Sequence, residues 1–220
     1  MIKIKNIKIK LLEKLVTLFG FDRLIVSSLE KIITENLGEK TMSKIEHRLD
    51  SKYGISLTES IGQFQKFDVI LREFFGAGAD GLEKKFLESI CKVKKSENKN
   101  IWFSIEDETT KKIILETYGD EDNVKILNFV NQESNTISDI LNHFKFPQTS
   151  GYRKINNLID TGLLIEDGYV MSIDKKKVST YHALFDSIRI DIVKNKIIID
   201  VQFEKNNLHE SAIMQTVFSL

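Results

Sequence analysis

The spacing of apolar residues changes once along this chain, and the change separates a helical part from a part with strands. Before Gly162 the apolar side chains recur every three or four residues, as they do in the segment 24–37. After Gly162 they alternate with polar side chains, as they do in the segment 188–203. Residues three and four apart share a helix face, whereas every second residue shares a strand face. We therefore expect an α+β protein, mainly α, with a C-terminal β-hairpin.

The first 95 residues have the pattern of a helical bundle. The 220 residues include only one proline and 11 glycines, so few residues interrupt a helix. Ser56 and Glu59 have the spacing of a capping box, in which each side chain binds a free backbone amide of the first turn. Gly38 is placed to end the helix before it. We expect this bundle to regulate or to dimerise.

Charge divides the chain further. Residues 1–95 carry a net charge of +5, residues 96–135 a net charge of −5, and the rest none. The change falls in KVKKSENKN, residues 92–100, a polar stretch without periodicity that is typical of a linker. We expect a helical bundle at 1–95, a linker at 96–104, a winged helix-turn-helix at 105–204, and a tail at 205–220 that is a candidate dimer segment.

The sequence lacks the residues that several classes of function require. One cysteine, Cys91, and four scattered histidines are too few for a thiolate-rich metal site, and we expect Cys91 half-buried on a helix. No phosphate loop or nucleophile–base spacing stands out, so we expect neither an enzyme nor a cofactor. No long uncharged apolar run is present, so we expect no membrane association and a cytoplasmic protein.

The order of elements in the second half is that of a winged helix-turn-helix. Asp120 is placed to cap one helix, and Thr136 and Asp139 form a capping box before a short helix. Pro147 stands in the first turn of the next helix, which Gly162 ends. Strands follow, with turns expected at 167–168 and at 195. Such a motif places its last helix in the major groove of DNA.

The helix 148–162 carries the expected reading residues. Its apolar side would face the core, and its polar side offers hydrogen-bond donors and acceptors for bases and phosphates. Lysines near the wing would add contacts to the backbone, although a solvated surface is the alternative for each charge, and Tyr152 equally fits packing on the wing. We expect contacts to DNA from Lys145, Gln148, Thr149, Ser150, Tyr152, Arg153, Lys154, Asn156, Lys175, Lys176 and Lys177.

The segments ETYGDEDNVKILNFV, TISDILNHFKFPQTSGYRKINNLIDTGLLIEDG, DKKKVSTY and RIDIVKNKIIIDVQF together resemble ArsR-like winged-helix transcription regulators of archaeal type. The resemblance covers residues 105–204, and PQTSGYRKINNLIDTGLL is its most specific part. It implies sequence-directed binding of double-stranded DNA by a homodimer. Metal-sensing members carry paired cysteines beside the recognition helix, and none occurs in this half, so thiolate metal sensing is not implied. The helical half is similar to uncharacterised modules found before such winged helices.

Two other functions stay open beside transcription regulation. The winged helix would instead dock a protein partner if its third helix and wing carried an apolar patch and no positive band. The helical half is the expected place for a small-molecule or protein ligand that gates DNA binding. Its alternating start, with Lys3, Lys5, Lys8 and Lys10, is a short strand, a basic arm along DNA, the first turns of the helix that follows, or a frayed terminus.

Overall fold

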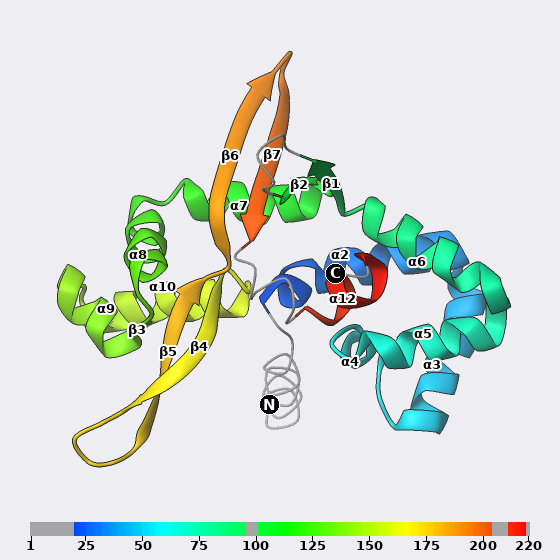
Figure 1. Cartoon of the computed structure of the whole chain (residues 1–220), viewed down its shortest axis with the longest axis horizontal. Helices are drawn as coiled ribbons and strands as arrows, with labels where there is room; N and C mark the ends of the chain where they lie inside the picture. Colours follow the sequence, from blue (N-terminus) through cyan, green and yellow to red (C-terminus); the bar gives the residue numbers. More distant parts are fainter. Residues whose placement is uncertain (1–19, 96–100, 204–210, 219–220) are drawn as a thin grey trace, which may run out of the picture.

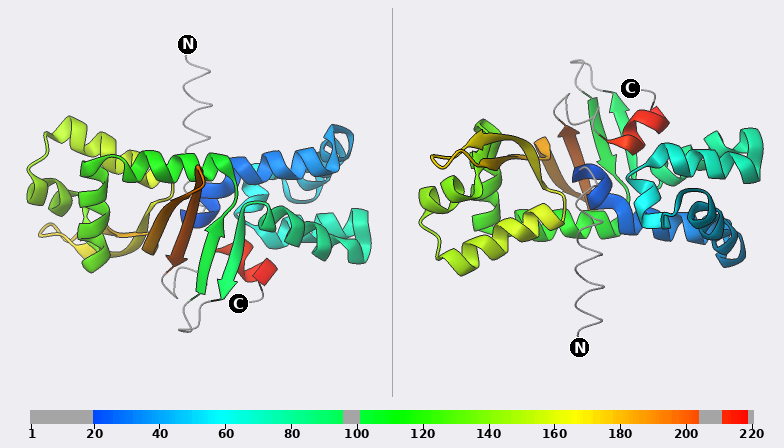
Figure 2. Two further views of the ribbon diagram at one scale, coloured as in Figure 1. Left: turned by 90° about the horizontal axis from the view of Figure 1, so that it is seen from above. Right: turned by 90° about the horizontal axis from the view of Figure 1, so that it is seen from below.

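The protein has an α+β fold in which a helical bundle and a second group of helices lie on either side of a sheet (Figure 1). The computed structural model describes residues 20–95, 101–203 and 211–218. The basic segment 1–10 lies outside the described residues. Figure 2 shows the same division from above and from below. Among the described helices, none has an apolar stretch long enough to cross a bilayer.

Helices occupy most of the first half of the described chain and alternate with strands in the second. The helices are α2 (Gly20–Leu37), α3 (Glu39–Tyr53), α4 (Leu57–Ile61), α5 (Phe64–Phe75), the 3-10 turn η1 (Gly76–Gly78), α6 (Ala79–Glu88), α7 (Glu108–Tyr118), α8 (Glu121–Gln132), α9 (Ile137–Phe144), α10 (Gln148–Asp160) and α12 (Ala212–Phe218). The strands are β1 (Cys91–Lys95), β2 (Ile101–Ile105), β3 (Asn135–Thr136), β4 (Leu164–Met171), β5 (Lys177–Ala183), β6 (Phe185–Val193) and β7 (Lys196–Phe203).

The helical bundle forms as its periodicity predicts. Helix α2 packs against α3, α4 and α6, and its apolar side chains are buried. The capping box of Ser56 and Glu59 is present, with both reciprocal hydrogen bonds. It opens the short helix α4, and α5 starts separately after Gly62 and Gln63. The sequence has one continuous apolar stripe in this region, but the structure divides it between the two helices α4 and α5.

The segment that we expected to be a linker forms a hairpin. Strands β1 and β2 pair with each other, and β2 pairs with β7, which gives an antiparallel sheet in the order β1-β2-β7-β6. The linker prediction is therefore wrong for residues 92–95 and 101–104, while residues 96–100 lie outside the described part. The reason is pairing with a distant strand, because Phe103 and Ile105 lie opposite Val201 and Ile199.

A second sheet of three strands follows the order β3-β5-β4 and supports α8, α9 and α10. The turn expected at Asp167 and Gly168 is absent. Strand β4 runs through both residues to Met171, with a shift of register between Glu166 and Tyr169. Gly168 has a φ of 82°, so the glycine accommodates an irregularity within the strand and does not reverse the chain. The hairpin closes instead over residues 172–176.

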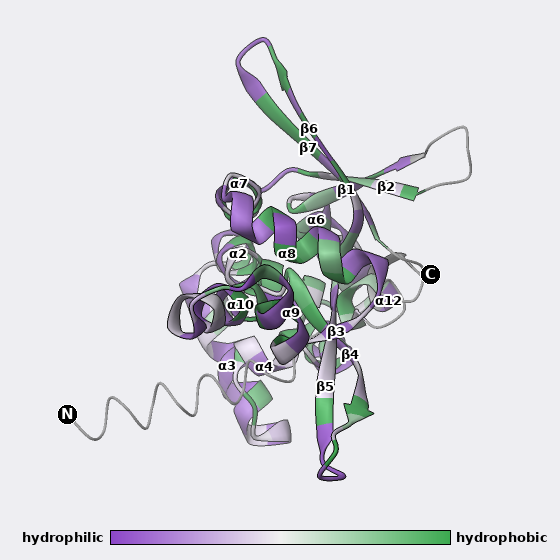
Figure 3. Cartoon of the chain, turned by 90° about the vertical axis from the view of Figure 1, so that its left-hand side faces the viewer, coloured by the Kyte–Doolittle hydropathy of each residue, from purple (hydrophilic) through white to green (hydrophobic). Residues whose placement is uncertain are grey.

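The turn expected near Asn195 is confirmed. Lys194 and Asn195 both have positive φ, and Val193 pairs with Lys196 across them. We expected one face of this hairpin to be buried, and only its base meets that expectation. Ile199 and Val201 are buried, whereas Ile192 near the turn is 74% exposed. The outer half of the β6–β7 hairpin projects from the molecule as an arm (Figure 3).

Four phenylalanines join the bundle to the central sheet. Phe203 of β7 packs edge-on against Phe21 of α2 at 5.0 Å between ring centroids, and against Phe103 and Phe185 at 5.2 Å. All four side chains are buried. The buried side chains of the bundle and of both sheets belong to one continuous hydrophobic core.

The C-terminal tail, which we expected as a dimer segment, packs inside its own chain. Helix α12 contacts α5 and α6, and Ile213 and Met214 are fully buried there. Ser211 donates a hydrogen bond of 2.5 Å to Asp22, and the Ala212 amide donates another of 3.0 Å to the same carboxyl. The apolar side chains of Ile213 and Met214 are therefore used within the chain and not offered to a second copy.

Candidate nucleic-acid interface

Helices α9 and α10 meet across a three-residue turn, as the sequence predicts. The capping box of Thr136 and Asp139 starts α9, and Lys145 ends it in the left-handed conformation with a φ of 53°. Close packing then fixes the two helices. A Cβ at Gly151 would lie 2.3 Å from a methyl carbon of Leu141 and 3.0 Å from the Cβ of Phe146. Only glycine fits there without displacing its neighbours.

The helix α10 presents the polar side that its periodicity predicts. Gly151, Ile155 and Leu158 are buried against the neighbouring elements. On the other side, Tyr152 is 45% exposed. Of the predicted contacts on or before this helix, Ser150 and Lys154 are half-buried, and the exposed ones are Lys145, Gln148, Thr149, Tyr152, Arg153 and Asn156.

Lys154 differs from the other predicted contacts because it is held by neighbouring carboxylates. Its Nζ lies 2.5 Å from Asp120 and 3.4 Å from Asp122, both at the start of α8. Only 20% of its side chain is exposed. The hydrogen bond and charge of Lys154 lower the pKa of Asp120, which also caps α8. Lys154 therefore ties α10 to α8, and we withdraw it from the set of free cations.

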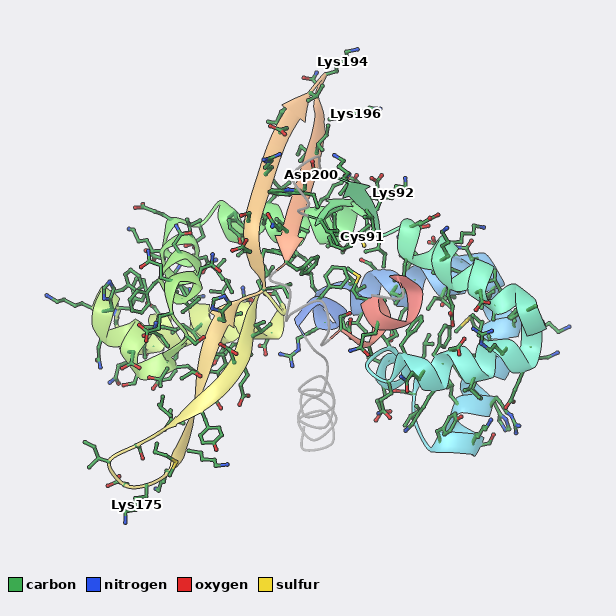
Figure 4. All side chains as sticks on the ribbon, in the orientation of Figure 1. Cys91, Lys92, Lys175, Lys194, Lys196 and Asp200 are labelled. Carbon is green, nitrogen blue, oxygen red and sulfur yellow. The ribbon has the colours of Figure 1, made fainter. Side chains whose placement is uncertain are left out.

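The three lysines of the β4–β5 hairpin are exposed at its outer end. Figure 4 labels Lys175 at this end, and the β6–β7 arm with Lys194 lies on the opposite side of the molecule. The Nζ of Lys177 lies 4.1 Å from the centre of the Tyr169 ring, a cation–π contact that fixes its direction. Lys175 has a φ of 58° in the loop. These lysines share one end of the molecule with α9 and α10.

Two further residues belong to this surface although the sequence argument did not name them. Asn157 is exposed one turn after Arg153, and both line a hollow beside the start of α8. The four-residue spacing is the signal that would have found it. Tyr169 contacts Lys177, but it directly follows the turn expected at residues 167–168, so the sequence does not place the two side chains together. The surface thus combines one arginine, amide and hydroxyl groups, and a lysine-bearing hairpin.

Other chemical groups of the described residues do not form a comparable surface. Cys91 is fully buried at the start of a strand and not half-buried on a helix, and burial raises the pKa of its thiol to about 12. Asp68, Asp80 and Glu83 lie close enough together to hold a cation. Arg72 already forms ion pairs with Asp68 and Asp80, however. Burial also raises the pKa of Glu83, which disfavours its charged form.

Comparison of the chain with protein-family models, with curated proteins and with solved structures gave no match.

Proposed function

We propose that this chain is a sequence-specific DNA-binding protein that regulates transcription through a winged helix-turn-helix. In this proposal α8, β3, α9, α10, β4 and β5 form the DNA-binding unit, α10 enters the major groove, and the β4–β5 hairpin is the wing. The observation that carries the proposal is the exposed polar side of α10, which follows a tight turn and shares one end of the molecule with three free lysines. The major groove is wide enough to admit such a helix.

The basic side chains of α10 and of the β4–β5 wing have different roles in this proposal. Arg153 is the one basic side chain on the exposed side of α10, so it would contact a guanine edge or a phosphate near the reading helix. Lys145 and the three wing lysines would hold the DNA backbone. Among the described acidic side chains, none forms an ion pair with these five cations. If Arg153 also holds a phosphate, five phosphate contacts correspond to a salt slope of about −4.5 per subunit, and if it reads a guanine, four contacts correspond to about −3.6.

The helical bundle acts on the reading helix through α2 in this proposal. Arg23 of α2 donates a hydrogen bond of 2.7 Å to the carbonyl of Ile159 in the last turn of α10. Beside it, a Cβ on Gly162 would lie 2.1 Å from the Gly20 carbonyl oxygen, so the two backbones touch. When a small molecule or protein binds to the bundle, the effect of binding would be transmitted to α10 through these two contacts.

The experiment is selection of bound duplexes from random DNA, followed by titration of the selected site and a random duplex at several salt concentrations. We expect a preferred sequence, and Arg153→Ala should weaken specific binding by about 1–3 kcal/mol if the side chain reads a guanine. If it holds a phosphate, binding to both duplexes should fall equally and the salt slope should shrink. Equal binding to all sequences by the wild type, or no binding, would contradict the proposal.

A protein partner is the second candidate, and exposed apolar side chains on the wing favour it. Met171 is 57% exposed and Ile173 fully exposed at the end of the β4–β5 hairpin. Such side chains suit a protein surface better than a phosphate backbone. The substitution Ile173→Ser separates the two candidates, because it should leave DNA affinity nearly unchanged and weaken a protein contact.

A further inference from the structure

The β6–β7 arm carries a free sheet edge. Strand β6 is the last strand of the order β1-β2-β7-β6, so in the described part of the chain its outer side has no partner strand. Near the base of this strand, Asn131 of α8 donates a hydrogen bond of 3.3 Å to the Asp186 carbonyl. The outer half of the strand extends away from the rest of the molecule (Figure 1). An exposed strand edge is a template for pairing with another chain.

The turn of the arm decides which backbone groups of β6 point outward. Two residues with positive φ, Lys194 and Asn195, form a tight turn whose flanking pair, Val193 and Lys196, is hydrogen-bonded. Hydrogen-bonded and non-hydrogen-bonded pairs alternate along an antiparallel ladder. Counting back from Val193, the amides and carbonyls of the even-numbered residues 188, 190 and 192 point away from β7. All three of these residues are isoleucines.

The two edges of this sheet are protected differently. Strand β1 at the opposite edge has the sequence CKVKK, and its lysines disfavour pairing with a second strand. Strand β6 contains no lysine. Its apolar face is partly uncovered, since Ile190 is 39% and Ile192 74% exposed. Its other face carries Arg189 and Asp191, both exposed.

We propose that two copies of this chain form a dimer through antiparallel pairing of their β6 strands about a twofold axis at Ile190. Ile190 then lies opposite Ile190 of the second copy, and Ile188 lies opposite Ile192, each with outward backbone groups on both sides. Arg189 lies opposite Asp191 of the second copy, and the symmetry makes this ion pair twice. The two four-stranded sheets become one sheet of eight strands. This proposal does not depend on DNA binding.

Charge complementarity selects this register over its neighbours. The outward groups belong to even-numbered residues, so an even-numbered residue must lie opposite an even-numbered residue of the second copy. This condition holds when the twofold axis passes through a residue, and the neighbouring registers place the axis at the next residue on either side. An axis at residue 189 puts two arginines opposite each other, and an axis at residue 191 puts two aspartates opposite each other. Like charges directly opposite each other destabilise a sheet, whereas opposite charges stabilise it. Only the axis at Ile190 makes both charged pairs attractive.

Neither Arg189 nor Asp191 forms an ion pair with a described residue of its own chain. Asp191 lies opposite Ile198 within its own hairpin, and no described basic side chain forms an ion pair with it. Arg189 lies over the Trp102 ring of β2 at 4.4 Å, so in the single chain its guanidinium reaches across β7, and in the dimer it turns to the outer side of β6. The neighbouring Asp200 is held by Lys94 at 2.8 Å.

The experiment measures the mass of the full chain by sedimentation equilibrium from low to high micromolar concentration. We expect a monomer–dimer equilibrium. Asp191→Lys places two like-charge pairs in the dimer and should weaken dimerisation at least about tenfold. The double variant Arg189→Glu with Asp191→Lys restores opposite charges with reversed sign and should recover most of the affinity. The matched control is Asp174→Lys, the same change of charge in the exposed wing loop, which should leave dimerisation unchanged.

A cross-linking measurement tests the register directly. Ile190→Cys places two thiols opposite each other at the axis and should cross-link rapidly with a short thiol reagent. Ile173→Cys, at the fully exposed wing tip, should not. Buried Cys91 should contribute little background. A monomer at high micromolar concentration would overturn the proposal. A dimer that is insensitive to Asp191→Lys, or is not rescued by the double variant, would place the interface elsewhere.

Discussion

The guanidinium of Arg23 donates a hydrogen bond of 2.7 Å to the backbone carbonyl of Ile159. One residue belongs to the first described helix and the other to the last turn of α10, 136 positions later. The carbonyls of a last helical turn lack the regular helical partner, and a cation there also complements the helix dipole. The Ile159 carbonyl accepts a second hydrogen bond, from the Gly162 amide at 3.0 Å. Burial lowers the pKa of Arg23, while the charge of Asp160 acts in the opposite direction. The bundle thus caps the proposed reading helix.

Removal of this cap should destabilise the whole chain. Arg23→Ala leaves a partly buried carbonyl without its charged donor, and we expect a loss of about 1–3 kcal/mol in the free energy of unfolding. Urea unfolding followed by circular dichroism measures it. Arg48→Ala is the control, because Arg48 forms an exposed ion pair with Glu73 and should cost less. Equal losses in the two variants would contradict the role assigned to Arg23.

Gly162→Ala should destabilise more than the same change at another helix end. Gly162 and Gly54 both have positive φ, so alanine is strained at each. A Cβ at Gly54 meets no atom within 4 Å, whereas a Cβ at Gly162 would lie 2.1 Å from the Gly20 carbonyl oxygen. We expect a loss of about 1 kcal/mol at Gly54 and of more than about 3 kcal/mol at Gly162. Thermal unfolding of the two variants, compared side by side, decides the point, and similar losses would count against tight contact of α2 with α10.

Lys154 and Arg153 should respond differently to substitution although they are adjacent. Lys154→Met keeps the aliphatic stem and removes the ion pair with Asp120, so it should lower stability by well under about 1 kcal/mol. It should leave DNA affinity within about twofold of the wild type, because its charge is already neutralised. Arg153→Ala should weaken DNA binding with little change in stability. Titration of both variants on one duplex tests this, and a larger loss of affinity for Lys154→Met would return Lys154 to the interface.

The contribution of Asp22 to the stability of the protein should fall as the pH rises from about 4 to about 7. Burial raises the pKa of this carboxyl to about 7, and hydrogen bonds from Ser211 and Ala212 only partly oppose the effect. The folded state therefore holds a proton that the unfolded state has lost above its ordinary pKa of about 4. The stabilisation is complete below the unfolded pKa and is lost as the pH passes the folded one.

Asp22→Asn isolates this contribution. The amide cannot ionise, so the dependence of unfolding free energy on pH between about 4 and 7 should become flatter by on the order of 1–3 kcal/mol. Chemical unfolding of wild type and variant at four pH values in this window measures the difference. Parallel curves for the two proteins would show that the Asp22 carboxyl does not hold a proton in the folded state.

Local signals explain the parts of the fold that could be predicted from the sequence. The capping boxes at Ser56 and Thr136 depend only on residues within one turn, and both are confirmed. The exposed side of α10 also follows from periodicity, because Gly151 and Ile155 are buried and Arg153 is not. The DNA-binding role of that side stays a prediction.

The features that could not be predicted depend on distant partners. Strand β2 forms because Phe103 and Ile105 pair with β7, almost a hundred residues later. The sequence before β2 is short and polar, so it resembles a linker. Lys154 is neutralised by Asp120, which precedes it by 34 positions. Gly168 has the local sequence of a turn, yet β5 pairs on both sides of it, so the glycine becomes a bulge.

The packing of Phe203 on Phe21, together with the hydrogen bond between Ser211 and Asp22 across 189 positions, has a consequence for how the chain acquires its structure. The first helices cannot complete their core on the ribosome until the last strand and α12 have emerged. Folding therefore requires nearly the whole chain. Contacts between residues that are far apart in the sequence, such as these, make folding slow. Until β7 has emerged, Phe21 lacks its partner Phe203, and apolar surface exposed in this way promotes aggregation.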